Sequence, residues 1–165
     1  MSELEKKIYS INPGYLTIHE EFIRKHSQFG GGSDSEKYGQ ARTFSSVYEI
    51  YVYAFFIGQA RGARVEIHPE DKLKTFWELE NWKPIDLVSC LLACAIGDSP
   101  MDMNKLEGLE GAELSQEVSK LKRTIEEYAN GGLAYLRGLF EDDPDLVEDD
   151  MLFINLLEEG AIGTR

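Results

Sequence analysis

An uncharged apolar run restricts the fold of this chain more than any other feature. IYVYAFFIG fills residues 50–58, nine residues without a charge. A helix that spans a bilayer needs about 20 apolar residues, so this run is too short to cross a membrane. A helix enclosed by protein is expected instead, because Ser46 and Glu49 form the S-x-x-E pattern of a capping box. Gly62 follows Arg61 at the point where a left-handed residue ends many helices.

Apolar side chains fall on two separate stripes of this expected helix. Tyr48, Tyr51 and Phe55 form one stripe, and Ile50, Ala54 and Ile57 form the other. A helix that is apolar on most sides lies inside its protein. We therefore predict a central helix from residue 46 to residue 61.

Other segments also have helical patterns. A short amphipathic helix is expected over residues 20–29, and a short helix over MLFINLLEE at the C-terminal end. IDLVSCLLACAIG follows Pro84, a residue favoured in the first turn of a helix, and carries no charge after Asp86. We expect this helix to end at Gly97 and to be buried in the protein.

The clearest amphipathic pattern covers residues 114–139, where apolar residues recur at spacings of three and four. Charged residues, Glu126 and Glu127 among them, are expected on its solvent side. Gly131 and Gly132 lie in its middle, and each costs about 1 kcal/mol relative to alanine. Two explanations stay open, a close approach of the central helix and a break at the glycine pair.

Two stretches alternate in the manner of strands, YLTIH at 15–19 and ARVEIH at 63–68, and they are expected to pair with each other or with their equivalents in a partner chain. The fold class predicted is mainly α: a compact helical domain of about five helices, with a short two-stranded β element near the N-terminal part. We expect residues 1–165 to form a single domain. Residues 30–42, rich in glycine and serine, are expected to form a flexible loop.

The charge is unevenly distributed along the chain. The net charge is −13, and residues 76–165 hold seven bases against twenty acids. That part would repel a phosphate backbone, so any contact with DNA is expected from the N-terminal part. The cations available there include Arg24, Lys25, Arg42, Arg61 and Arg64. The first residues lack the apolar core of a secretory signal, so we expect a cytoplasmic protein.

Motifs for catalysis are weak. Cys90 and Cys94 lack further ligands for zinc and are expected as buried small apolar residues. His19 and His68 would meet if the two expected strands paired, although a surface or half-buried position is the expectation for each. The acids of EDDPDLVEDD, residues 141–150, lack the order of a calcium loop and are expected to form a solvated turn. We expect the protein to bind no cofactor and to have no enzymatic activity.

The two tryptophans, Trp77 and Trp82, frame the stretch FWELENW. Aromatic residues of this kind anchor partner proteins at interfaces. Packing in the core is the expected use of the tryptophans. The alternative is a surface that contacts a partner protein or DNA and consists of Trp77 and Trp82 together with Arg42, Arg61 and Arg64.

Four segments between residues 43 and 159 together resemble the Dnd-system-associated family, small accessory proteins encoded beside bacterial DNA phosphorothioation genes. They are TFSSVYEIYVYAFFIGQARGARV, PIDLVSCLLACAIGD, IEEYANGGLAYLRGLFEDDP and DDMLFINLLEE. The resemblance implies a bacterial cytoplasmic protein tied to DNA modification or to a linked phage-defence system. It supplies no catalytic residues.

Three functions follow from these observations. The first is a non-enzymatic adaptor or regulator that binds a protein partner in a DNA-modification or defence complex, with self-association left open. The second is a DNA-binding protein of ribbon-helix-helix character that uses the N-terminal part, which the net charge disfavours. The third is a small metal-dependent hydrolase that uses the carboxylates of residues 141–150.

Overall fold

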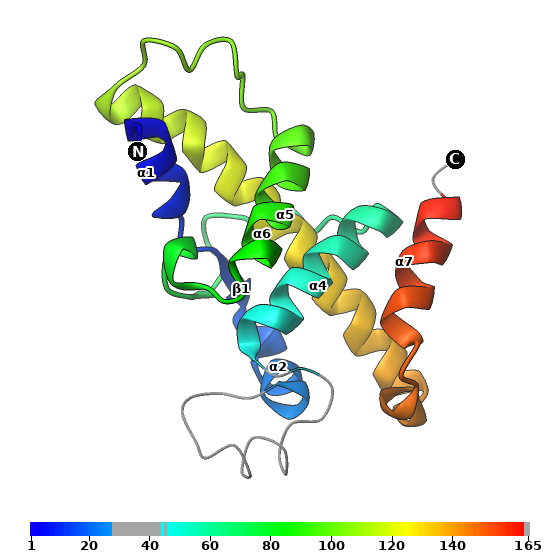
Figure 1. Ribbon diagram of the computed structural model, residues 1–165. Coiled ribbons are helices and arrows are strands. Elements are labelled where there is room, and N and C mark those ends of the chain that lie inside the picture. Colours follow the sequence, from blue (N-terminus) through cyan, green and yellow to red (C-terminus); the bar gives the residue numbers. More distant parts are fainter. Residues whose placement is uncertain (28–43, 45, 164–165) are drawn as a thin grey trace.

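The computed structural model describes residues 1–27, 44 and 46–163, and helices make up most of it (Figure 1). The described residues form six α-helices, three short 3-10 helices and a two-stranded sheet, as the sequence predicts in outline. Their order is α1 (Glu3–Tyr9), β1 (Gly14–Leu16), η1 (Thr17–His19), α2 (Glu20–His26), α4 (Val47–Arg61), β2 (Leu73–Thr75), η2 (Leu79–Asn81), α5 (Ile85–Asp98), α6 (Gly111–Asp142), η3 (Pro144–Glu148) and α7 (Leu152–Gly163). The expected loop at residues 30–42 lies outside the described residues.

The predicted central helix is α4, and its ends are the predicted ones. Ser46 is the N-cap, and its hydroxyl accepts a hydrogen bond of 3.2 Å from the backbone N–H of Glu49. Gly62 ends the helix in the left-handed conformation, with φ 64°. Buried residues lie on nearly all sides: Ile50, Tyr51, Val52, Ala54, Phe55, Ile57 and Gly58. None of the described helices is long and apolar enough to cross a membrane.

The glycine pair of α6 lies against α4 and the chain just after it. The helix runs unbroken through Gly131 and Gly132, so the close-approach explanation is confirmed. A Cβ on Gly132 would overlap the carbonyl oxygen of Ala54, and one on Gly131 would overlap that of Ala63. On the other side of the crossing, a Cβ on Gly58 would overlap the carbonyl oxygen of Tyr128. The two backbones therefore approach more closely than any side chain would allow.

The small sheet is present, but its second strand is not the predicted one. β1 pairs antiparallel with β2, with Tyr15 opposite Lys74, and residues 63–68 form no strand. The alternation of ARVEIH does correspond to burial, because Ile67 is buried while Arg64 and Glu66 are exposed. Its backbone lies on α6 instead of on a strand, with the N–H of Val65 donating to the carbonyl of Glu127 at 3.1 Å.

α5 differs from its prediction in burial. Val88, Leu91, Leu92 and Ala95 face the core, but the outer face is exposed and includes Ile85, Ser89, Cys90, Ala93 and Gly97. The prediction of a buried Cys90 is therefore wrong, while Cys94 is partly buried and both thiols are free. The segment has no charge between Asp86 and Asp98 because its exposed positions, like its buried ones, carry uncharged residues. Its composition therefore does not distinguish the exposed face from the buried one.

The glycine pair yields a test of the crossing. Replacing Gly132 by alanine should lower the free energy of unfolding by about 3 kcal/mol, because the added methyl group overlaps the backbone of Ala54. The matched control is Gly138→Ala in the same helix, where a Cβ would meet nothing within 4 Å. That exchange should raise the free energy by about 0.5–1 kcal/mol through helix propensity alone. Urea denaturation followed by circular dichroism measures both, and equal effects would contradict the close crossing.

Candidate functional site

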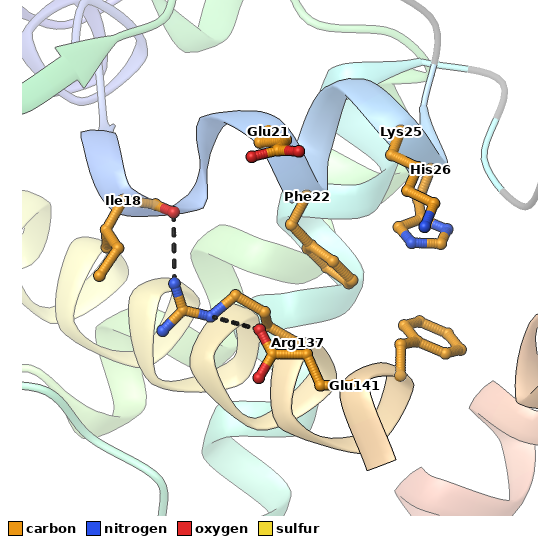
Figure 2. A pocket seen from close by; sticks show the side chains of 8 residues that line it. Ile18, Glu21, Phe22, Lys25, His26, Arg137 and Glu141 are labelled. Atoms are coloured by element: carbon orange, nitrogen blue, oxygen red, sulfur yellow. Dashed lines mark hydrogen bonds and ion pairs between the residues drawn. The ribbon is translucent and has the colours of Figure 1, made fainter. Parts of the chain in front are cut away.

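A pocket opens between α2, η1 and the C-terminal half of α6. Its volume is about 270 Å³. Figure 2 shows its lining, which comes from segments more than a hundred residues apart in the chain. The described lining residues are Ile18, Glu21, Phe22, Lys25, His26, Arg137, Phe140 and Glu141.

Three aromatic rings form the floor of this pocket. Phe22 and His26 are one helical turn apart on α2, with ring centroids separated by 4.6 Å. The ring of Phe140 on α6 stacks on His26 at 4.9 Å with an interplanar angle of 19°, and it lies 5.7 Å from Phe22. All three side chains are buried. The floor is thus a cluster of three mutually packed aromatic rings.

Arg137 closes one side of the pocket and holds η1 in place. Its Nη1 donates to the carbonyl oxygen of Ile18 at 3.3 Å, and its Nε lies 4.0 Å from a carboxylate oxygen of Glu141 (Figure 2). The side chain of Ile18 remains 63% exposed at the rim. Lys25 and Glu21 complete the rim from α2. Two cations and two carboxylates therefore surround an aromatic floor.

His19 lies next to this pocket and is held neutral. It is only 2% exposed, and its Nδ1 has no hydrogen-bond partner among the described residues. Burial lowers the pKa of His19 to about 4, and the positive charge of Arg137 adds to the effect. The expected surface or half-buried position is wrong for His19. It holds for His68, which is exposed, and the two do not face each other across a sheet because residues 63–68 form no strand.

A buried polar network joins β1 to α6. The N–H of Gly14 donates to Glu126 Oε1 at 3.0 Å, and the N–H of Leu16 donates to Asn130 Oδ1 at 2.7 Å. The carbonyl of Gly14 accepts from Asn130 Nδ2 at 3.2 Å and from the hydroxyl of Tyr51 at 2.7 Å. Burial raises the pKa of Glu126, and the charge of Lys122 and the Gly14 N–H oppose this shift. The free edge of β1 is therefore occupied by side chains.

Glu126 and Glu127 are thus not on the solvent side, and that prediction is wrong. Each is 6% exposed. The carboxylate of Glu126 accepts from the N–H of Gly14, and that of Glu127 accepts from Arg64, so each binds a group distant in sequence. Glu127 Oε2 lies 2.5 Å from Nε of Arg64, whose guanidinium also lies 5.2 Å from the ring centre of Tyr128. Two charged neighbours on one helix are buried here by different contacts.

Two of the three arginines expected to contact a partner, Arg61 and Arg64, have contacts within the chain. Arg61 lies over the ring of Tyr135 at 4.6 Å, and its Nη2 is 3.1 Å from Glu159. Arg64 is paired with Glu127 as described above. Neither lines the pocket, and Arg42 lies outside the described residues. The structure therefore brings neither Arg61 nor Arg64 to the α2–α6 pocket.

The two tryptophans have different fates. Trp82 is fully buried, as core packing predicts, and its Nε1 donates to the carbonyl of Trp77 at 2.9 Å. Its indole lies against Tyr48, Tyr51 and Phe76. Trp77 is 71% exposed, so core packing is wrong for it and the partner-anchor alternative is untested.

The described part of the chain lacks the arrangement that a metal-dependent hydrolase or a ribbon-helix-helix protein requires. No three His, Cys, Asp or Glu side chains among the described residues come together where they could hold a metal ion, the acids of residues 141–150 included. A ribbon-helix-helix protein pairs one strand of each of two chains, whereas β1 pairs with β2 of the same chain. Neither alternative is supported by the fold.

The fold and the pocket define a class of protein: a helical protein with an aromatic-floored surface pocket. Comparison with protein families then places the chain. Residues 34–161 match the family described as DNA sulphur modification system-associated protein 4, and the chain belongs to that family. This confirms the resemblance drawn from the sequence. Searches of curated proteins and of solved structures give no significant match.

The buried His19 makes stability depend on pH. Its pKa is lowered in the folded state, so below about pH 6.5 the unfolded chain takes up a proton that the folded chain refuses until about pH 4. The free energy of unfolding should therefore fall as the pH is lowered from about 6.5 to about 4, by up to about 1.4 kcal/mol per pH unit from this group. Urea titrations of the wild-type protein and His19→Gln test this, and the variant should lack this component. His68→Gln, at an exposed histidine, should keep it, and an unchanged pH profile in His19→Gln would contradict the assignment.

Proposed function

We propose that this protein is a non-enzymatic cytoplasmic adaptor that binds another protein of its DNA sulphur-modification system through the α2–α6 pocket. Membership of the family described as associated with that system supports the accessory role. The observation that carries the proposal is the aromatic floor of the pocket, with exposed Ile18 at its rim.

The dimensions of the pocket favour one inserted side chain over a free small molecule. Its volume of about 270 Å³ is at the lower limit of ligand pockets, which range from about 300 to 1,000 Å³. Protein interfaces are instead dominated by a few anchor residues that fill such pockets. An aromatic or aliphatic side chain of the partner would pack against Phe140 and His26 and would contact Ile18. The binding energy would come from apolar area, at about 25 cal/mol per Å² removed from water.

The rim adds orientation. Each side of the opening carries one cation and one carboxylate, Lys25 and Glu21 on α2 and Arg137 and Glu141 on α6. Such a rim discriminates among partners by the order of their charges more than it adds affinity. We expect the partner segment to carry an acid and a base on either side of its apolar anchor.

The lining also supports a binding role over a catalytic one. Of the eight described lining residues, none is Ser, Thr or Cys, the side chains that most often serve as nucleophiles. The buried His19 is neutral near pH 7, and its Nδ1 has no hydrogen-bond partner in the described chain. These observations support a surface that recognises a partner.

The proposal is tested by co-purification with each protein of the sulphur-modification system expressed singly. We expect one of them to be retained by the wild-type protein. Ile18→Asp should reduce its retention at least tenfold, because a carboxylate at the rim would have to lose its water when the anchor enters. The measurement is the affinity of the purified pair by isothermal titration calorimetry.

Ile85→Asp is the matched control, because Ile85 is also an exposed isoleucine, 44% accessible, and lies on α5 away from the pocket. Its affinity should stay within about twofold of the wild type. If no protein of the system is retained, or if both variants weaken binding equally, the proposed function is wrong.

A further inference from the structure

A second surface feature lies on the N-terminal half of α6, where α1 runs beside it (Figure 1). Two adjoining hollows occur there, with volumes of about 230 and 350 Å³. They share Ser119 and Lys122 and so form one groove. Its described lining consists of Lys7, Ser10, Ile11, Asn12, Ser115, Val118, Ser119, Lys120, Lys122, Arg123 and Glu126.

Two of the four cations among the described lining residues of this groove donate to neutral groups. Lys7 Nζ donates to the hydroxyl of Ser115 at 2.8 Å, and Lys122 Nζ donates to the side-chain carbonyl of Asn12 at 3.2 Å. A hydroxyl or an amide oxygen fixes the position of an ammonium group but does not neutralise it. The positive charges of Lys7 and Lys122 are therefore fixed in position and available to an anion.

Glu126 is the one carboxylate among the described residues that line the groove. The hollow next to α1 has no carboxylate among its described lining residues. Lys120 is paired with Glu117 at 2.6 Å, so the charge of Lys120 is already compensated. Glu126 lies 3.9 Å from Lys122, but it is buried and accepts from the N–H of Gly14, and its burial raises its pKa. The groove is thus a positively charged strip on a chain of net charge −13.

We propose that this groove binds the phosphate backbone of a nucleic acid, with Lys7, Lys122 and Arg123 as the contacting cations. Lys, Arg, Ser and Asn side chains make most backbone contacts in protein–DNA complexes, and all four types line the groove. The hydroxyls of Ser115 and Ser119 donate to carbonyls of their own helix, and they can rotate toward a phosphate oxygen.

The length of the groove fits a strand better than a single ion. Ser115 and Arg123 are eight residues apart on a straight helix, which corresponds to about 12 Å. Successive phosphates of one DNA strand are farther apart than their rise of about 3.4 Å along the helix axis, so that length spans more than one phosphate and at most about three. The acids elsewhere on the chain act weakly here where they lie beyond a Debye length, about 8–10 Å at physiological salt. A negative net charge therefore does not prevent local binding.

The test compares two serine substitutions by fluorescence anisotropy of a labelled DNA duplex at about 50 mM salt. Ser119→Glu places a carboxylate where the two hollows join and should weaken binding at least tenfold. Ser89→Glu is the matched control, since Ser89 is an exposed serine on the outer face of α5 and receives the same charge. Its affinity should stay within about twofold of the wild type. Both variants are first checked for wild-type circular dichroism and thermal midpoint.

The salt dependence provides a second measurement. Three phosphate contacts predict that affinity for a duplex falls about 40-fold between 50 and 200 mM salt, from a slope of about −0.9 per contact. Arg123→Gln, at an exposed position, should lower that slope by about one and keeps the test independent of the Ser119 variant.

Three outcomes would overturn the proposal. The first is no anisotropy change up to about 50 µM protein at low salt, since nonspecific affinities lie near 1–100 µM. The second is an equal loss in the two serine variants, which would reflect net charge alone. The third is tighter binding of poly-glutamate than of the duplex, which would assign the groove to an acidic protein.

Discussion

The contact between the backbones of α4 and α6 is the constraint on which the rest of the structure depends. Gly58 lies against the carbonyl of Tyr128, and Gly132 lies against the carbonyl of Ala54, so no side chain separates the two helices. Each glycine costs a helix about 1 kcal/mol relative to alanine. Close contact offsets that cost, because α6 then buries the side of α4 that faces it. It also fixes the course of α6, and α6 contributes to both candidate binding surfaces.

Polar side chains on α6 then position the N-terminal segments. Glu126 and Asn130 bind the backbone of β1, and Arg137, further along the helix, binds the carbonyl of Ile18. The Glu126 and Asn130 contacts are buried or half-buried, where an unpaired polar group would cost about 1–3 kcal/mol, so they specify one position for β1. The floor of the pocket follows from this, since η1 leads directly into α2 with Phe22. The same turns of α6 hold Lys122 at the second groove.

The features that the sequence predicted well are those with local signals. Ser46 and Gly62 mark the ends of α4, and the glycine pair of α6 indicates a close neighbour, because caps and glycines act over a few residues. The same S-x-x-E signal at Ser2 and Glu5 begins α1, which was missed since seven residues carry too little periodicity. β2 was missed for the same reason, with only three residues. The pocket and the groove could not be predicted, because each joins segments about a hundred residues apart, and no pattern encodes that pairing.

Charge shows most clearly why composition is a poor guide to surfaces. The C-terminal part has a large excess of acids, which argues against any contact with phosphate. In the folded chain, however, Lys122 and Arg123 from that part meet Lys7 from the other end, and Glu126 beneath them is occupied by Gly14. Within a Debye length the local arrangement determines the potential, and the total charge affects mainly long-range approach. An acidic protein of this family can therefore present a basic groove and a mixed-charge pocket on different parts of one long helix.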